Sequence, residues 1–460
     1  MEKKLLLLGL DCVTPQLLFD EWLNDLPNIK ELVRKGIHGK LYSTIPPITV
    51  PAWTSMMTSK DPGTLGFYGF RNRRSYDYEN LYFANAKYIK DKTIWNYLSR
   101  YRMSSLIFGV PQTYPPKPLK GIMVASFLTP NKDVQYTYPD EIKAELDKVA
   151  DGDYIIDVEN FRTDDKDRLL KQIYLMEERR FKAFRHFYGK ESYDFAMLVV
   201  MGFDRIHHGF WRFFDKTHRL YEPGNPYESA IYDFYRAVDK EIGRTIDLAD
   251  ENTSIMVVSD HGAKTMKGAI CINEWLQKEG LLVLKKKPSQ QMRMTMDMVD
   301  WDKTRVWGEG GYYCRIFFNV KGREPKGLIP QEDYHRFRDE LKAKLEALED
   351  DEGRCIKTKV FKAEEIYRQV NNIPPDLIVY LGNLDWRSAG SVGIGSVHLF
   401  ENDTGPDDAN HAQEGVFIWY LPGIKIDKQK EVYSIYDIAP SILRYFDIEV
   451  PQDMIGNSIL

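Results

Sequence analysis

Acidic and imidazole side chains follow three short apolar segments of the chain, close to the point where each segment ends. They are Asp11 after residues 5–10, Asp204 and His208 after residues 195–200, and Asp260 and His261 after residues 254–258. Carboxylate oxygen and neutral imidazole nitrogen are ligands for divalent ions such as Zn²⁺ and Mn²⁺. Several carboxylates brought together without a cation would repel one another. The pattern therefore predicts a centre for two divalent metal ions.

Each of these residues has a structural alternative when it is taken alone. Asp11 could cap a helix, and a single histidine such as His208 is more often a hydrogen-bonded core residue than a ligand. Asp260 and His261 are more specific, because a glycine that permits a tight turn follows them. His411 lies in the loop before the last predicted strand, so we expect it to reach the same place.

A hydroxyl group that could act as a nucleophile lies in the proline-rich segment 44–53. Three prolines stiffen this segment, and a pattern that could be a helix follows it. A hydroxyl at such a junction, beside free backbone N–H groups and the positive end of a helix dipole, can meet an incoming phosphoryl oxygen. Thr49 is the candidate, and the structural alternative is that Thr49 only caps the helix.

These residues must be positioned by a sheet. Short, continuous apolar runs are typical of buried parallel strands, and they occur at residues 5–10, 105–110, 121–126, 195–200, 254–258, 377–381 and 416–420. Amphipathic helices are predicted over residues 165–186 and after Pro226. The alternation predicts an α/β fold with a mostly parallel central sheet and helices on both faces. In such a sheet the carboxyl ends of the strands form the edge where ligands bind.

The chain changes character after residue 284, where a polar, methionine-rich stretch begins. Strand-like stretches at 304–320 and 356–361 enclose an amphipathic helix over 334–348. We therefore predict a core made of residues 1–284 and 373–460, with a smaller α+β accessory subdomain at 285–372.

The composition excludes several classes of function. The 460 residues carry 63 Lys and Arg against 68 Asp and Glu, a net charge of -5, so we expect no nucleic-acid polymer and no membrane as partner. The four cysteines show no paired spacing, which favours a reducing compartment. The apolar run near the N-terminus ends at Asp11 without a cleavage site, so it is interpreted as a strand rather than a signal peptide. A cytoplasmic protein is expected, and its oligomeric state is left open.

The motifs together resemble the alkaline phosphatase superfamily, and within it the type I phosphodiesterase/nucleotide pyrophosphatase branch with its prokaryotic phosphohydrolase and phosphomutase relatives. The resemblance extends over nearly the whole chain in the family's order. It rests on Leu-Gly-Leu-Asp11, the segment 49–58 that begins with Thr49, Met-Gly-Phe-Asp204-Arg-Ile-His-His208, Val-Val-Ser-Asp260-His261-Gly262 and Asn410-His411-Ala-Gln-Glu-Gly415.

The resemblance implies an alkaline-phosphatase-like fold and a distribution of the ligands. It assigns Asp11, Thr49, Asp260 and His261 to one metal ion, and Asp204, His208 and His411 to the other, with His207 outside both sets. It also implies that Thr49 attacks phosphorus and forms a phosphothreonine, which water then hydrolyses. Zn²⁺ is the expected ion, and Mn²⁺ or another divalent ion stays an alternative, because all seven ligands offer nitrogen or oxygen and no thiolate is present to bias the choice.

Departures from the family pattern bear on the substrate. Trp53 stands where sulfatases carry an arginine, which argues against a sulfatase, and a threonine nucleophile favours phosphodiesters or pyrophosphates. Ala52 replaces the asparagine that steadies the phosphoryl oxygen in nucleotide pyrophosphatases, so Lys267 or Asn273 is expected to supply that donor. Arg71 could pair with a second phosphate of a small, nucleotide-like substrate.

Two alternatives remain beside this phosphodiesterase hypothesis. One is a phosphomutase-like or phosphomonoesterase activity on a small phosphorylated metabolite. The other is a metal-dependent binding protein that keeps the site and turns nothing over.

Overall fold

The apolar runs at residues 5–10, 105–110, 121–126, 195–200, 254–258 and 416–420 lie in one nine-stranded sheet. In the computed structural model, which describes residues 3–424 and 429–460, the strand order is β20-β2-β19-β9-β1-β8-β5-β6-β7. The strands are β1 (Leu5–Leu10), β2 (Ile37–Tyr42), β5 (Ser105–Val110), β6 (Gly121–Ala125), β7 (Thr137–Tyr138), β8 (Phe195–Val200), β9 (Ser254–Val258), β19 (Glu414–Tyr420) and β20 (Val432–Ser434).

The strand directions correct one prediction. β9, β1, β8, β5 and β6 run parallel, as expected for the centre of an α/β sheet. β19 runs antiparallel to both β9 and β2, although the sequence predicted a parallel strand at 416–420. An antiparallel strand begins at the edge where its neighbours end. This reversal explains how His411, which precedes β19, reaches the carboxyl edge of the parallel strands.

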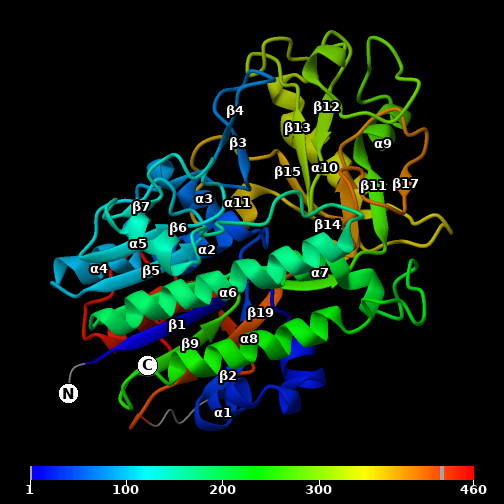
Figure 1. Ribbon diagram of the computed structural model, residues 1–460. Coiled ribbons are helices and arrows are strands. Elements are labelled where there is room, and N and C mark those ends of the chain that lie inside the picture. Colours follow the sequence, from blue (N-terminus) through cyan, green and yellow to red (C-terminus); the bar gives the residue numbers. More distant parts are fainter. Residues whose placement is uncertain (1–2, 425–428) are drawn as a thin grey trace.

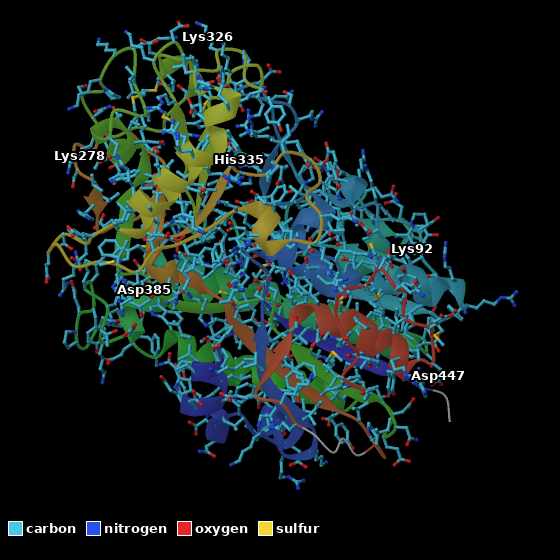
Figure 2. All side chains as sticks on the ribbon, turned by 180° about the vertical axis from the view of Figure 1, so that it is seen from behind. Lys92, Lys278, Lys326, His335, Asp385 and Asp447 are labelled. Atoms are coloured by element: carbon cyan, nitrogen blue, oxygen red, sulfur yellow. The ribbon has the colours of Figure 1, made fainter. Side chains whose placement is uncertain are left out.

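Helices cover both faces of the sheet, as predicted. Side chains alternate along a strand, so Leu6 and Leu8 of β1 belong to one apolar core and Leu5 and Leu7 to the other. The first core packs against helices α1 (Pro27–Lys35), α5 (Ile142–Val149), α6 (Lys166–Lys190), α7 (Gly202–Phe214) and α8 (Ala230–Ile246). The second packs against α2 (Thr49–Thr58), α4 (Ile94–Arg100) and α12 (Ile438–Tyr445). α6 and α8 cross in front of the sheet in Figure 1, and the red helix α12 lies in front in the opposite view (Figure 2).

A smaller antiparallel sheet forms the accessory part, drawn in green to orange at the top of Figure 1. Its strand order is β12 (Val306–Glu309), β13 (Cys314–Phe318), β15 (Leu377–Tyr380) and β14 (Lys359–Phe361), and α10 (Tyr334–Glu346) packs against it. The run at 377–381 was expected in the main sheet, but β15 pairs with β13 and β14 instead. The accessory sheet thus takes strands from both sides of the boundary predicted at residue 372.

The remaining elements are short. They are the strand pair β10 (Gly262–Thr265) and β18 (Ala409–Ala412), the three strands β11 (Gly268–Cys271), β16 (Trp386–Ala389) and β17 (His398–Leu399), the pair β3 (Arg71–Arg73) and β4 (Leu81–Phe83), and helices α3 (Pro62–Leu65), α9 (Ile272–Lys278) and α11 (Ala363–Ile366). Single helical turns lie at η1 (Gln16–Glu21), η2 (Leu23–Asp25), η3 (Ala86–Tyr88), η4 (Met296–Met298), η5 (Gln331–Asp333), η6 (Leu381–Leu384) and η7 (Ile435–Asp437). Within the described ranges, every helix lacks the combination of length and apolar character that crossing a membrane requires.

Candidate metal centre

The seven predicted metal ligands come from five segments that meet at the carboxyl edge of the main sheet. They are Asp11 after β1, Thr49 at the start of α2, Asp204 and His208 on α7, Asp260 and His261 after β9, and His411 on β18. Asp204 and His208 share one face of α7, because they are one turn apart. Each of the seven residues is at most 4% exposed. Burying so many ionisable groups in one place is costly unless a nearby charge of opposite sign compensates them.

The first group consists of Asp11, Asp260, His261 and Thr49. The Nε2 atom of His261 lies 3.2 Å from an Asp260 carboxylate oxygen and 3.2 Å from the Thr49 hydroxyl. The same nitrogen is 3.9 Å from an oxygen of Asp11. Ligand atoms of the two aspartates and the histidine all lie within 4.8 Å of one another. This spacing suits a single cation held by oxygen and nitrogen.

The second group contains His208, His411 and Asp204. The Nε2 atoms of the two histidines face each other at 3.2 Å, and Asp204 Oδ2 lies 3.4 Å from His208 Nε2. The rings of His261 and His411 stack with their centroids 3.9 Å apart, so the two groups adjoin. Adjacent cation sites of this kind are the arrangement of two-metal hydrolases.

The histidine rings are oriented by their other nitrogen atoms. Nδ1 of His208 lies 2.7 Å from an Asp407 oxygen, and Nδ1 of His411 lies 2.7 Å from the Pro47 carbonyl. Both partners only accept hydrogen bonds, so each Nδ1 carries the proton and each neutral ring presents an Nε2 lone pair. Two lone pairs that face each other at 3.2 Å repel unless a cation lies between them. The imidazoles therefore have the tautomer that metal ligation requires.

Two buried carboxylate oxygens support the same interpretation for the first group. Asp11 Oδ1 and Asp260 Oδ2 have no hydrogen-bond partner. Burial raises the pKa of both aspartates, and the neighbouring charges of Asp204 on Asp11 and of Asp11 on Asp260 raise it further. Burial also lowers the pKa of His261 to about 4. The residues fit a divalent cation, which would supply the positive charge that these oxygens lack.

The capping alternative for Thr49 does not hold. Ile48 is the N-cap of α2, and Thr49 is the first helical residue. Its hydroxyl faces His261 rather than a backbone amide of the next turn. Asp11 does not cap a helix either, since its Oδ2 accepts a hydrogen bond of 2.7 Å from the Trp53 indole.

Asp407 is a residue that the sequence interpretation missed. One of its oxygens contacts Nδ1 of His208, and the other accepts hydrogen bonds from Arg162 at 2.8 Å and Arg387 at 2.7 Å. Asp407 is 1% exposed, and burial alone would raise its pKa, but the charges of Arg387 and Arg162 and the hydrogen bond with His208 hold that pKa well below the usual value. In the sequence, the one feature that could have pointed to Asp407 was its position four residues before His411.

Tyr312 was also missed, although it comes from the accessory part. Its ring stacks on His411 at 3.9 Å between centroids and on His208 at 4.7 Å. Its hydroxyl accepts a hydrogen bond of 2.8 Å from Arg162. Tyr312 therefore joins the accessory part to the second group of ligands.

The two neighbours of the α7 ligands lie outside the groups. Arg205 forms a two-bond ion pair with Asp157, and its third nitrogen lies 3.3 Å from Asp204. His207 contacts the hydroxyl of Tyr235 at 3.1 Å, and burial lowers the pKa of His207 to about 3. This is the placement outside the ligands that was expected for His207.

The predicted substrate residues are not gathered with the ligands. The Asn273 amide group donates to the carbonyls of Gly308 and Gly390 and accepts from the Gly308 N–H, so Asn273 holds the backbone together instead of offering a donor to a substrate. Lys267 pairs with Asp385 at 2.8 Å. The Arg71 guanidinium lies over the ring of Phe83. The substrate roles of Lys267 and Arg71 stay predictions.

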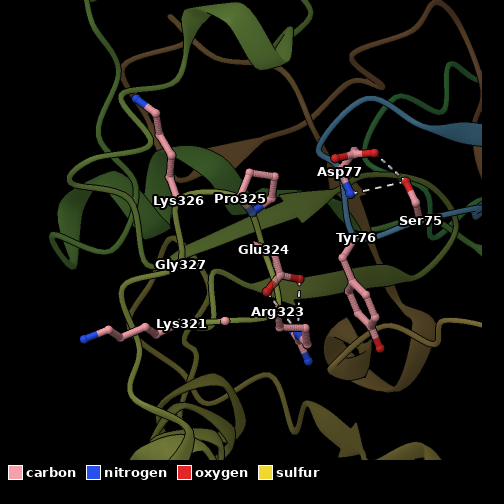
Figure 3. Close-up of a pocket in the computed structure, with 10 residues that line it drawn as sticks. Ser75, Tyr76, Asp77, Lys321, Arg323, Glu324, Pro325, Lys326 and Gly327 are labelled. Carbon is pink, nitrogen blue, oxygen red and sulfur yellow. Dashed lines mark hydrogen bonds and ion pairs between the residues drawn. The ribbon is translucent and has the colours of Figure 1, made fainter.

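Two surface cavities lie apart from the ligands. One of about 490 Å³ is formed by residues 75–77 and 321–327, where Ser75 bonds to Asp77 and Arg323 bonds to Glu324 (Figure 3). A groove of about 1160 Å³ lies beside the C-terminal end of α7, and Trp211, Lys267 and Asp385 are among the residues that line it. Neither cavity is lined by a predicted metal ligand.

A comparison with protein families decides the assignment. Residues 5–407 match the model of the type I phosphodiesterase / nucleotide pyrophosphatase family. The chain belongs to this family. Its members are phosphoric ester hydrolases of the alkaline phosphatase superfamily. No curated protein matches the sequence.

Solved structures of low sequence identity share the fold of this type I phosphodiesterase family member. Human ectonucleotide pyrophosphatase/phosphodiesterase 5 is 15% identical with a TM-score of 0.57, over 99% of this chain and 97% of that chain. An inactive variant of the murine protein, solved in complex with AMP, is 14% identical with a TM-score of 0.56, over 99% and 97% of the two chains. Phosphonoacetate hydrolase from Sinorhizobium meliloti, in complex with phosphonoacetate, is 15% identical with a TM-score of 0.59 over 92% of each chain.

Proposed function

We propose that this protein hydrolyses a phosphodiester or a nucleotide-type phosphoric anhydride, with Thr49 as nucleophile and two divalent ions as cofactors. The observation that carries the proposal is the pair of adjoining, buried ligand groups, with Thr49 Oγ1 beside His261. Membership of the type I phosphodiesterase / nucleotide pyrophosphatase family supports it independently.

The seven side chains would hold the ions in two sets. Asp11, Asp260, His261 and Thr49 form one set, and Asp204, His208 and His411 form the other. Bound divalent ions supply Lewis acidity, which lowers the pKa of a coordinated hydroxyl and offsets the charge of phosphoryl oxygens. Zn²⁺ suits ligands of mixed imidazole and carboxylate type, and Mn²⁺ is the alternative.

The position of Thr49 supports its proposed attack on phosphorus. It is the first residue of α2, where backbone N–H groups have no helical partner and the helix dipole favours negative charge. The bond formed joins Thr49 Oγ1 to phosphorus, and the bond broken releases the alcohol or phosphate leaving group. Water then cleaves the phosphothreonine ester and returns the hydroxyl to Thr49.

The residues around Thr49 fix its geometry. The Trp53 indole lies one helical turn after Thr49 and donates to Asp11, which ties α2 to the end of β1. Nδ1 of His261 is held at 3.1 Å by the Gly262 carbonyl, so its Nε2 stays directed toward Thr49. Buried, hydrogen-bonded ligands of this kind need little reorganisation during the reaction.

The experiment that tests the function joins metal analysis with substrate ranking. Purified protein is expected to contain about two divalent ions per chain, and to cleave an activated aryl phosphodiester faster than the matching monoester. Removal of the metal by a chelator should abolish turnover, and added Zn²⁺ or Mn²⁺ should restore it.

The competing activities give different results in the same experiment. A monoesterase or phosphomutase-like enzyme would reverse the substrate ranking. Protein that holds two ions but cleaves none of a broad panel of phosphate esters would be a binding protein, and the proposal would be wrong.

A further inference from the structure

Cys12 is a buried residue between the two ligand groups that the proposed reaction does not use. It follows Asp11 directly, is fully buried, and its backbone N–H donates to an Asp260 oxygen at 3.2 Å. Its sulfur and one nitrogen each of His208 and His411 all lie within 4.8 Å of one another. We propose that the Cys12 sulfur is a ligand of the metal ion held by His208 and His411. The inference rests on the proposed two-metal function and refines it.

The two histidines give independent evidence that a cation belongs beside this sulfur. Their Nε2 lone pairs face each other at 3.2 Å, while the Nδ1 atoms are held by Asp407 and Pro47. A cation that relieves this repulsion must sit near both Nε2 atoms, which is where Cys12 can reach it. The thiol donates a hydrogen bond to the Gly262 carbonyl at 3.5 Å, and because S–H is a weak donor this bond is given up readily.

The balance of charge is consistent with a sulfur ligand. Coordination forms a sulfur–metal bond and releases the thiol proton to water. Asp11, Asp260 and Asp204 with a Cys12 thiolate would carry four negative charges, which equals the charge of two divalent ions.

The ligand would also affect the choice of metal. Thiolate favours Zn²⁺ over Mn²⁺ or Mg²⁺, which prefer oxygen ligands. The sequence alone did not reveal this preference, because Cys12 has no partner at a metal-binding spacing in the sequence. The fold brings it to histidines about 200 and 400 residues away.

The backbone conformation at Cys12 allows a glycine variant to be used as a test. Its φ of 69° lies in the left-handed region, where a glycine is free of strain. Cys12→Gly is therefore expected to fold, and Cys12→Ser keeps a side chain of similar size without sulfur. The parent for all variants carries Cys355→Ser, which removes the exposed thiol but keeps the buried Cys271 and Cys314.

Cobalt substitution gives a readout that does not depend on activity. The full-length, metal-free parent is loaded with two equivalents of Co²⁺, and a sulfur-to-cobalt charge-transfer band is expected in the near ultraviolet. The band should vanish in Cys12→Gly and in Cys12→Ser. The affinity for the second Co²⁺ should fall by at least about tenfold in both variants.

The possible failures point to different conclusions. A parent that holds two Co²⁺ and cleaves the aryl diester without the band would overturn sulfur ligation but leave the proposed function intact. A band that persists in Cys12→Gly would also overturn ligation by Cys12 and leave the proposed function intact, since another thiol would then be the source of the band. A parent that binds no Co²⁺ and cleaves no phosphate ester would refute the proposed function together with the ligand.

Discussion

Asp407 illustrates how this protein orients a single proposed metal ligand. The carboxylate holds Nδ1 of His208 and is itself held by Arg162 and Arg387. A metal-binding histidine usually gives its other N–H to such an acceptor, which fixes the ring and makes it a better ligand. Asp407 is thus a positioning residue for His208 rather than a ligand.

Replacing Asp407 by asparagine should weaken metal binding. An amide oxygen can still accept the Nδ1 hydrogen bond, but it lacks the negative charge that strengthens a histidine as a metal ligand. We expect the affinity for the weaker-bound Zn²⁺ to fall about 10- to 100-fold, as measured by competition with a chromophoric chelator. Asp408→Asn is the matched control, because Asp408 is also buried but its side chain does not bond a histidine in the described structure. Equal losses in the two variants would argue against a specific role for Asp407.

The sequence predicted which residue types meet, but not what surrounds them. The seven residues predicted as ligands could be picked out because each follows an apolar run or lies in a family motif, and their role as ligands stays a prediction. Asp407 and Tyr312 could not, since their roles depend on contacts with His208 and His411 that only the fold creates. Asn273 was misinterpreted because its amide serves backbone groups 35 and 117 residues away.

At the scale of elements, the close contact of α2 with β1 sets the position of Thr49, the proposed nucleophile. A Cβ atom at Gly9 of β1 would lie 2.4 Å from the Trp53 ring and 2.9 Å from Val199. The missing side chain lets α2 approach the strand, and Trp53 then reaches Asp11 just beyond it.

Gly9→Ala should therefore disturb both packing and the metal centre. Overpacking of this kind typically lowers the free energy of unfolding by about 1–3 kcal/mol, which urea denaturation can measure. Gly189→Ala in α6 is the control: a Cβ there meets nothing within 4 Å, and alanine favours a helix. The prediction fails if Gly9→Ala is as stable as the control.

The sequence predicted the position of most strands, but not all of their partners. Apolar runs identify buried strands, yet a run does not encode direction, so β19 was expected to be parallel. The run at 377–381 is equally apolar because β15 is central in the accessory sheet. Burial in one sheet cannot be distinguished from burial in another by composition.

At the scale of the whole molecule, buried histidines link stability to pH. His218, in the loop after α7, is 4% exposed and faces Asp215, Arg212 and the Asp408 backbone; burial lowers its pKa to about 4. An unfolded chain binds this proton near pH 6.5, whereas the folded chain binds it only near pH 4. The unfolded state is therefore favoured progressively as the pH falls from 6.5 to 4, and His218 has no such effect at higher pH.

The variant His218→Gln should lose part of this acid sensitivity. Between pH 7 and pH 5 its free energy of unfolding should fall by about 1–2 kcal/mol less than that of the wild type. Urea midpoints at the two pH values provide the measurement. His335→Gln is the control, since His335 lies exposed on α10 (Figure 2), and it should behave as the wild type. Identical pH dependence in all three proteins would contradict the link to His218.

Attack by Thr49 on the phosphorus atom is tested by the rate of aryl phosphodiester hydrolysis by Thr49→Ala at saturating Zn²⁺. We expect a fall of roughly 10³-fold or more in kcat, with folding unchanged. Thr49→Ser, which retains a hydroxyl, should keep much of the activity. If Thr49→Ala hydrolysed the diester as fast as the wild type, Thr49 would not be the nucleophile.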